Sequence, residues 1–148
     1  MFKKISSTQK AYLAGFLDGD GSIYVRLKPN LTYKYGFQVA PYVVLFQSQK
    51  EETNFRKICS LIDFGHIRER NDGMLEYVVN KQDAIFEFLK IIKPFVILKK
   101  KQVLLMFKIL DKKKSVKSQE EFNELAKLID NFRELNYSKK RKKHKLTP

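Results

Sequence analysis

Small residues recur every four positions near the start of the chain, at Ala11, Gly15 and Gly19. Ser6 and Gln9 have the spacing of a capping box, so the pattern predicts a helix that begins just after Ser6. The small residues share one face of that helix, and Ala14 widens the stripe. Because minimal side chains let two backbones approach closely, we expect this face to pack against a second helix.

The predicted helix ends in an acidic segment that contains Asp18 and Asp20. Carboxylates at a helix C-terminus are disfavoured by about 0.3–1 kcal/mol each, because the helix dipole is negative there. Glycines flank Asp20 on both sides, so the chain can turn sharply and keep its carbonyl oxygens accessible. Two interpretations stay open from the residues alone: a glycine-capped polar turn, and a site for a hard cation such as Mg²⁺.

The composition indicates a folded, strongly basic domain. The 148 residues carry a formal net charge of +14, and 43% of them are hydrophobic. This balance predicts a core and a polyanionic partner, with nucleic acid before an anionic membrane. Cys59 is the single cysteine, which favours a reducing environment, and His66 and His144 are too isolated to suggest zinc. Without a spanning segment or signal peptide, we expect neither a membrane partner nor secretion.

After the glycines, apolar and polar side chains alternate with the period of a β-strand. A half-buried strand is predicted over residues 23–28 and a second over residues 35–46. Pro41 lies within the second strand and predicts a sheet edge or a bulge. A short strand over residues 65–70 should then return over residues 74–79, because Asn71-Asp72-Gly73 is a hairpin signal.

Capping residues predict where the other helices begin. Ser48 and Ser118 each stand three residues before a glutamate, which is the capping-box spacing. Asn80 is expected to cap a helix between them, and a further helix follows the lysines at 99–101. The order αββαββα with further helices predicts an α+β fold, an antiparallel sheet with helices on one face plus C-terminal helices.

The other face of the predicted sheet is basic and rich in hydrogen-bonding groups. Such a face can read base edges in the major groove, and here it carries Tyr24, Arg26, Lys28, Gln38, Arg68 and Arg70. A solvated sheet face is the alternative interpretation, since antiparallel sheets commonly expose one side to water. A solvated face would more often mix charge signs, whereas only Glu76 intrudes here.

Residues 13–21, Leu-Ala-Gly-Phe-Leu-Asp-Gly-Asp-Gly, resemble the signature of the LAGLIDADG homing endonucleases. The αββαββα order is also that family's order. The segments at residues 28–30, 33–35, 68–70 and 99–102 are similar to the single-motif, intron-encoded branch. The resemblance covers residues 11–136 and implies one endonuclease domain over residues 1–137, followed by a basic tail over residues 138–148.

A single motif implies a homodimer with twofold symmetry in which the two motif helices pack together. The resemblance places the interface at Ala11, Tyr12, Ala14, Gly15 and Asp18. It also implies an enzyme that hydrolyses phosphodiester bonds on both strands of a long pseudo-palindromic double-stranded DNA site. The expected cofactor is Mg²⁺ or Mn²⁺, whereas Ca²⁺ should support binding without cleavage.

The family's functional residues can be carried over to positions of this chain. Asp20 and the Gly19 carbonyl match the metal ligands, and Asp20, Gln49 and Lys99 the catalytic groups. Gln47 and Lys101 are alternatives for the glutamine and the lysine. Contacts to DNA are expected from Tyr24, Arg26, Lys28, Asn30, Tyr33, Gln38, Tyr42, Arg68, Arg70, Glu76, Lys139, Lys140 and Lys142.

Other functions remain compatible with the sequence. Some proteins of this family act as RNA maturases or as DNA-binding proteins that do not cleave, so intron RNA is a further possible partner. If the motif is set aside, the basic composition also fits a ribosomal or RNA-packaging protein. The expected location is a chloroplast, a mitochondrion or the cytoplasm of a prokaryote.

Overall fold

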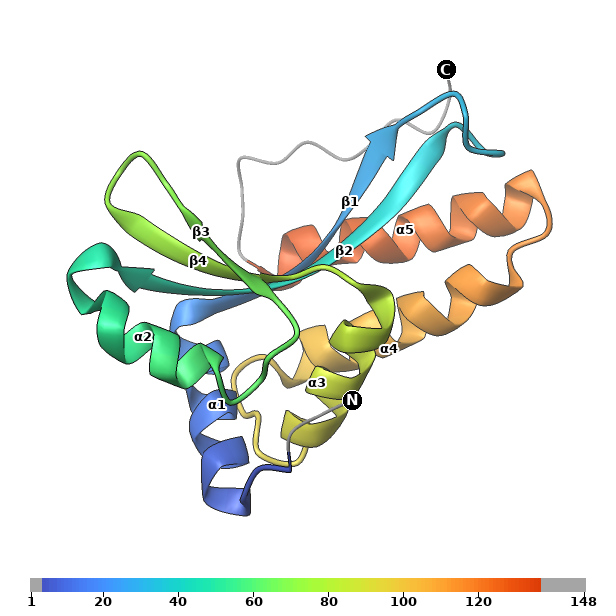
Figure 1. Ribbon diagram of the computed structural model, residues 1–148. Helices are drawn as coiled ribbons and strands as arrows, with labels where there is room; N and C mark the ends of the chain where they lie inside the picture. The colour runs from blue at the N-terminus through green and yellow to red at the C-terminus, as the bar shows by residue number, and fades with distance from the viewer. Residues whose placement is uncertain (1–3, 137–148) are drawn as a thin grey trace.

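The computed structural model describes residues 4–136, so the whole basic tail over residues 138–148, with Lys139, Lys140 and Lys142, lies outside the described residues. The helices and strands follow the predicted order (Figure 1). They are α1 (Ser7–Asp20), β1 (Gly21–Pro29), β2 (Phe37–Ser48), the 3₁₀ turn η1 (Gln49–Glu51), α2 (Glu52–Cys59), β3 (His66–Glu69), β4 (Met74–Val79), α3 (Gln82–Ile92), α4 (Lys100–Ser115) and α5 (Gln119–Leu135).

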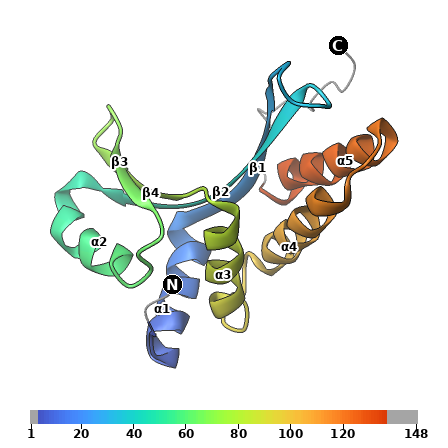
Figure 2. The same ribbon diagram turned by 45° about the vertical axis from the view of Figure 1, so that its right-hand side comes forward.

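The four strands form one antiparallel sheet in the order β1-β2-β4-β3. The sheet is strongly curved, and the helices lie on its convex side (Figure 2). The two hairpin ends rise on either side of the open, concave face (Figures 1 and 2). The predicted α+β fold with helices on one face is therefore confirmed.

Alternating burial along β1 divides the sheet into its two faces. Ile23, Val25 and Leu27 are almost completely buried against the helices, whereas Arg26 on the other face is exposed. From α1, Leu13 and Leu17 enter the same core. The period-two pattern therefore placed β1 correctly. It does so because burial of each apolar side chain contributes roughly 1.5–3 kcal/mol, which favours the register that turns all three toward the core.

The middle of the concave face is less polar than expected. Val44 of β2 pairs with Val78 of β4, and both side chains are buried although they point away from the helices. Phe46 stands opposite Glu76 on the same face. The polar groups therefore flank an apolar strip instead of covering the whole face.

Pro41 interrupts neither β2 nor its register. Pro41 pairs with Val25, and the β1–β2 register runs without a bulge from Gly21–Leu45 to Pro29–Phe37. On its other side β2 pairs with β4 only from Val43 onward. Pro41 thus lies where β2 has a neighbouring strand on one side only, which is where a sheet tolerates proline; the predicted edge is confirmed and the bulge is not.

Of the four residues predicted to cap helices, two make the predicted hydrogen bond, one caps a 3₁₀ turn instead, and one is displaced by its neighbour. The Ser6 hydroxyl accepts from Gln9 N–H at 3.1 Å, and the Ser118 hydroxyl accepts from Glu121 N–H at 3.1 Å. Ser48 instead accepts from Lys50 N–H, so α2 is preceded by a 3₁₀ turn and no capping box forms. Lys81, not Asn80, is the N-cap residue of α3, and it makes no side-chain capping hydrogen bond.

α1 ends without a left-handed glycine. Gly21 has an extended backbone, with φ −128°, and leads directly into β1. A Cβ at Gly21 would lie 2.5 Å from Leu17 Cδ1 and 2.8 Å from the Leu17 carbonyl oxygen. Of the two interpretations left open, the glycine cap is present only in part: Gly21 is the C-cap but is not left-handed, and glycine is needed here for close packing of the strand on the helix. No helix among the described residues is long and apolar enough to cross a membrane.

Candidate active site and nucleic-acid interface

Asp18 ties the end of α1 to the segment that leads into α4. One carboxylate oxygen accepts from the Ile97 and Leu98 N–H groups at 2.8 and 3.0 Å, and the other accepts from Lys99 N–H at 3.0 Å. Three backbone donors thus satisfy this carboxylate and offset the unfavourable helix dipole. These contacts give Asp18 a structural role at the end of the helix.

Lys99 makes a further contact across the same junction, from the start of α4 to the end of α1. Its Nζ donates to the Asp18 carbonyl oxygen at 2.9 Å, so the ammonium lies at the C-terminal end of α1. A cation is favourable there because the carbonyl groups of the last turn lack helical partners. Lys101 is the second residue of α4, and its side chain is exposed. Of the two lysines considered for the site, Lys99 is therefore the one held beside the acidic end of α1.

Asp20 differs from Asp18 in having no partner in the part of the chain that the structure describes. Asp20 is the last residue of α1, it is exposed, and its carboxylate makes no hydrogen bond or ion pair within residues 4–136. Gly19 is also exposed, and a Cβ added to it would meet nothing within 4 Å. A free carboxylate beside terminal helix carbonyls is a donor set of hard oxygens, which suits Mg²⁺ or Mn²⁺.

One copy of the chain provides an incomplete metal site. The described residues contain no group of three or more His, Cys, Asp or Glu side chains that could hold a metal ion. Cys59 is 3% exposed, and burial raises the pKa of its thiol to about 12, which makes it a poor ligand. A cation at Asp20 therefore needs further oxygens from outside this chain.

The two candidate glutamines lie in different environments. Gln47 belongs to β2, two residues beyond Leu45, which pairs with Gly21 immediately after Asp20. Gln47 also lines a groove of about 530 Å³ together with Tyr12 and Phe16 of α1. Gln49 is exposed in η1, and its N–H donates to the Gly73 carbonyl at 2.8 Å. The register thus brings Gln47, rather than Gln49, alongside the end of α1.

The small-residue face of α1 is open except at one position. Ala11, Gly15 and Gly19 are exposed, and a Cβ at Gly15 would meet nothing within 4 Å. Ala14 is fully buried inside the protomer, so its placement in the predicted dimer interface is corrected. A helix residue buried in its own core has no surface left for a second copy.

Exposed apolar side chains gather near this face. Tyr12 is 55% exposed on α1, and Ile97 and Leu98 are 80% and 73% exposed in the segment bound by Asp18. Their exposure contrasts with the fully buried Leu13 and Leu17 on the other side of the helix. Neighbouring apolar surface of this kind is typical of a protein–protein contact.

On the concave face, two strands carry a cluster of aromatic and basic side chains. Tyr24 and Tyr42 are cross-strand partners whose rings stack at 5.1 Å. The Arg26 guanidinium lies 5.9 Å from each ring centroid, and Lys28 Nζ lies 5.4 Å from the Tyr42 ring. The rings restrict these cations to the surface of the sheet. Four residues predicted to contact DNA therefore form one group.

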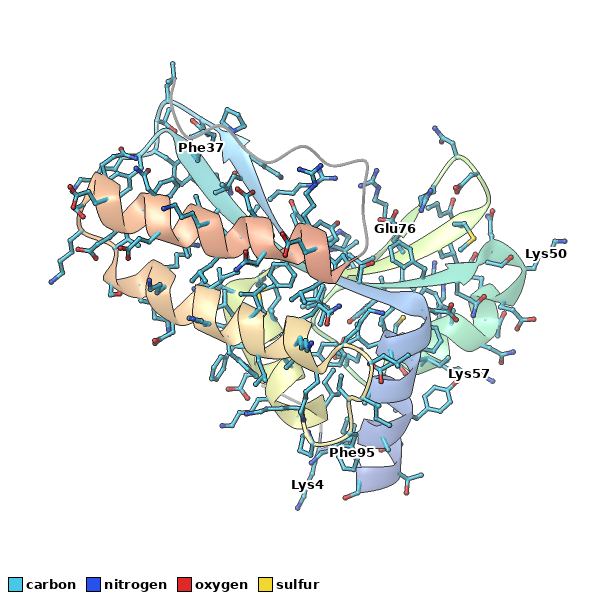
Figure 3. The ribbon with its side chains drawn as sticks, turned by 180° about the vertical axis from the view of Figure 1, so that it is seen from behind. Lys4, Phe37, Lys50, Lys57, Glu76 and Phe95 are labelled. Carbon is cyan, nitrogen blue, oxygen red and sulfur yellow. The ribbon has the colours of Figure 1, made fainter. Side chains whose placement is uncertain are left out.

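The β3–β4 hairpin brings the predicted Arg68, Arg70 and Glu76 together. Arg68 stands opposite Glu76, and Arg70 Nη1 lies 3.6 Å from Glu76 Oε1. Figure 3 labels Glu76 on the sheet, at the opposite side of the molecule from Phe95 in the helical layer.

Sequence reasoning missed Asp72, whose Oδ2 accepts from Arg70 Nη2 at 2.7 Å. The spacing of Asp72 two residues after Arg70 was the available signal.

The remaining predicted contacts lie at the other hairpin. Asn30 shapes the β1–β2 connection, because its Oδ1 accepts from Thr32 N–H at 3.0 Å and from Thr32 Oγ1 at 2.6 Å. Tyr33 is 44% exposed in the same connection, and Gln38 pairs with Lys28. These three residues therefore lie at the β1–β2 hairpin, at the other end of the sheet from Arg70.

Comparison with known proteins gives consistent matches. The sequence matches the family model of the LAGLIDADG endonucleases over residues 13–111. The DNA endonuclease I-CreI of Chlamydomonas reinhardtii is 36% identical over 132 residues, covering 88% of this chain and 80% of the relative. The DNA endonuclease I-CvuI of Chlorella vulgaris is 32% identical over 131 residues, covering 88% and 81%.

Solved structures agree with these sequence matches. The homing endonuclease I-CvuI in complex with the I-CreI target in 2 mM Mg, with the DNA not cleaved, matches with a TM-score of 0.84 and 31% identity, covering 91% of this chain and 86% of that one. Its complex with its own target in 2 mM Ca gives the same values. The archaeal intron-encoded homing endonuclease I-Vdi141I, complexed with DNA, shares the fold with a TM-score of 0.80 and 23% identity, covering 94% and 90%.

Proposed function

The chain belongs to the LAGLIDADG endonuclease family as a single-motif homing endonuclease, and we propose that it cleaves both strands of a long pseudo-palindromic DNA site as a metal-dependent homodimer. The observation that carries this proposal is the contrast at the end of α1. Asp18 is satisfied by three backbone donors, whereas Asp20 is exposed without a partner within residues 4–136.

Asp20 and the Gly19 carbonyl are the residues that would hold a divalent metal ion. When bound there, Mg²⁺ or Mn²⁺ supplies charge stabilisation at the phosphoryl and leaving oxygens and a more acidic water. Ca²⁺ prefers more ligands at longer distances, and we propose that it supports binding without cleavage. I-CvuI complexes with DNA in Mg and in Ca are consistent with divalent metal use.

Lys99 and Gln47 complete the proposed catalytic group. The Lys99 ammonium lies at the end of α1, where it can balance negative charge that develops on the scissile phosphate. The Gln47 amide can orient the attacking water, because β2 carries it past Gly21 toward the acidic end of the helix. We therefore assign the glutamine role to Gln47 in preference to Gln49.

The homodimer is supported by the open face of α1 and by the incomplete metal site. Ala11 and Gly15 leave room for a second copy of α1, and Tyr12 and Asp18 border them. Twofold symmetry would bring a second Asp20 to the same interface, so each copy would provide part of the metal environment. Exposed Ile97 and Leu98 would then be covered by the partner.

The concave face is proposed to bind the DNA. Its curvature and its basic, hydrogen-bonding groups suit a duplex, and Arg26, Arg68 and Arg70 can donate to guanine edges in the major groove. Because a dimer presents two such faces, the site should be a pseudo-palindrome. We further propose that the protein acts in a reducing compartment, an organelle or a prokaryotic cytoplasm, since Cys59 is a free buried thiol.

The test is cleavage of a supercoiled plasmid that carries the joined exon ends flanking the host intron, in the presence of Mg²⁺. The wild-type chain should give a linear product, whereas Asp20→Asn should bind the site and not cleave it. Asp111→Asn removes an equivalent exposed carboxylate from α4 and should cleave normally. Tight binding by the wild type without cleavage would instead support a non-cleaving DNA-binding protein, and full activity of Asp20→Asn would refute the assigned site.

A further inference from the structure

Two carboxylates hold Arg70 on the concave face. Arg70 Nη2 donates to Asp72 Oδ2 at 2.7 Å, and Arg70 Nη1 lies 3.6 Å from Glu76 Oε1. We propose that Asp72 is a positioning residue for sequence readout, which orients the Arg70 guanidinium toward the base edges of the DNA. This inference rests on the proposed function, because it assumes that the concave face binds a specific duplex.

The backbone fixes the Asp72 carboxylate in place. Its second oxygen, Oδ1, accepts from Met74 N–H at 3.2 Å, and the hairpin is closed by Arg70 N–H donating to the Met74 carbonyl at 2.9 Å. Gly73 adopts φ +80°, and its carbonyl accepts from Gln49 N–H at 2.8 Å, which ties the turn to η1. The acceptor for Arg70 is therefore rigid before DNA arrives, which lowers the cost of ordering a long side chain.

The charge of Asp72 is unexplained by the turn alone. Asparagine would accept the same hydrogen bond from Met74 and is equally favoured in such turns. A carboxylate on a face that contacts DNA phosphates repels them and weakens DNA binding. The negative charge of Asp72 is therefore unfavourable there unless it serves another purpose. The pair adds little to the stability of the free protein, because the Arg70 and Asp72 side chains are 40% and 51% exposed. Its effect is expected when DNA covers the pair.

Orientation of the guanidinium matters because of its donor geometry. Arginine presents its donors as a planar fork, and a bidentate contact to guanine requires that fork to lie in the plane of the base pair. Asp72 engages Nη2 from one side and Glu76 lies near Nη1, which leaves the remaining N–H groups for acceptors in the groove. Loss of the fixed acceptor should let the fork rotate among bases, so preference should fall while non-specific attraction increases.

The experiment is selection of bound sequences from a randomised double-stranded DNA library with the full chain. Arg70→Ala first identifies the symmetry-related base pair whose preference depends on Arg70. Asp72→Asn, which keeps the turn acceptor, should then reduce preference at that base pair about five- to tenfold, part of the discrimination of a bidentate contact. It should also bind unrelated DNA more tightly. Added to Arg70→Ala, it should change no base preference further.

Glu69→Gln is the matched control, because it removes one exposed carboxylate from the same hairpin without touching Arg70. It should raise affinity for all sequences alike and leave the base preferences unchanged. If Asp72→Asn behaves like this control while the wild type selects a clear sequence, the positioning role is refuted and the proposed function stands. If the wild type selects no sequence, both the proposed function and the role of Asp72 are overturned.

Discussion

At the scale of single residues, Asp18 and Asp20 have opposite environments although they are separated by one glycine. Asp18 accepts three backbone hydrogen bonds from residues 97–99, and Lys99 Nζ donates to its carbonyl. Asp20 is exposed and has no partner among residues 4–136. The first carboxylate therefore maintains the junction between α1 and α4, and the second is available for chemistry.

Alanine at each position should separate these two roles. Asp18→Ala should lower the free energy of unfolding by about 1.5–3 kcal/mol, because three backbone N–H groups lose a charged acceptor. Asp20→Ala should leave it unchanged or raise it by up to about 1 kcal/mol, because a carboxylate is removed from a helix C-terminus. Urea unfolding followed by circular dichroism, at equal protein concentrations, measures both values. Equal destabilisation by the two changes would contradict the assignment.

At the scale of helices and strands, local patterns predicted most of the fold. The alternation at Ile23, Val25 and Leu27 located β1, and the hydroxyls of Ser6 and Ser118 cap the helices they were predicted to cap. These signals succeeded because the interacting groups lie within a few residues of each other. Helix ends that depend on tertiary packing were harder to predict from the sequence. Lys81, for example, precedes α3 without any side-chain capping hydrogen bond.

The candidate site was predictable only in part, for the same reason. The acidic end of α1 and the lysines at 99–101 could be found from their residue types. The hydrogen bonds from residues 97–99 to Asp18 span about eighty positions, and no local pattern indicates them. The burial of Ala14 likewise depends on which elements pack on α1, so periodicity alone assigned it to the wrong face.

The end of β2 provides a test of how strand register selects the catalytic glutamine. Gln47→Ala should reduce the rate of DNA cleavage by at least about 100-fold while DNA affinity is retained, because a side chain that orients water or a proton acts in the transition state. Gln49→Ala should cleave at close to the wild-type rate, since Gln49 is exposed in η1. Single-turnover cleavage and gel-shift assays compare the two. The reverse ranking would restore Gln49 to the site.

At the scale of the whole molecule, the curved sheet and the open face of α1 present two different surfaces. The concave sheet faces away from the helices, and its hairpin ends extend beyond them (Figure 2). The exposed small residues of α1 and the apolar Tyr12, Ile97 and Leu98 lie elsewhere, near the acidic helix end. We propose that one surface binds DNA and the other a second copy, and Asp20 lies at the junction of α1 and β1, between the helix of one surface and the sheet of the other.

Gly15→Leu should test the second surface without disturbing the protomer. A Cβ at Gly15 meets nothing within 4 Å, so leucine should be accommodated and should improve the helix propensity of α1. In a dimer, the same side chain would hold the two α1 helices apart. We expect monomers in sedimentation velocity, an unchanged circular dichroism spectrum and loss of cleavage.

Lys127→Leu is the control for Gly15→Leu, because it adds an exposed leucine to α5, away from α1. This variant should sediment as a dimer and cleave DNA, since neither the face of α1 nor the concave sheet is changed. If Gly15→Leu also sediments as a dimer with full activity, α1 is not the interface. If the wild type is itself monomeric when bound to its site and still cleaves both strands, the twofold arrangement is refuted, because one copy supplies only one Asp20.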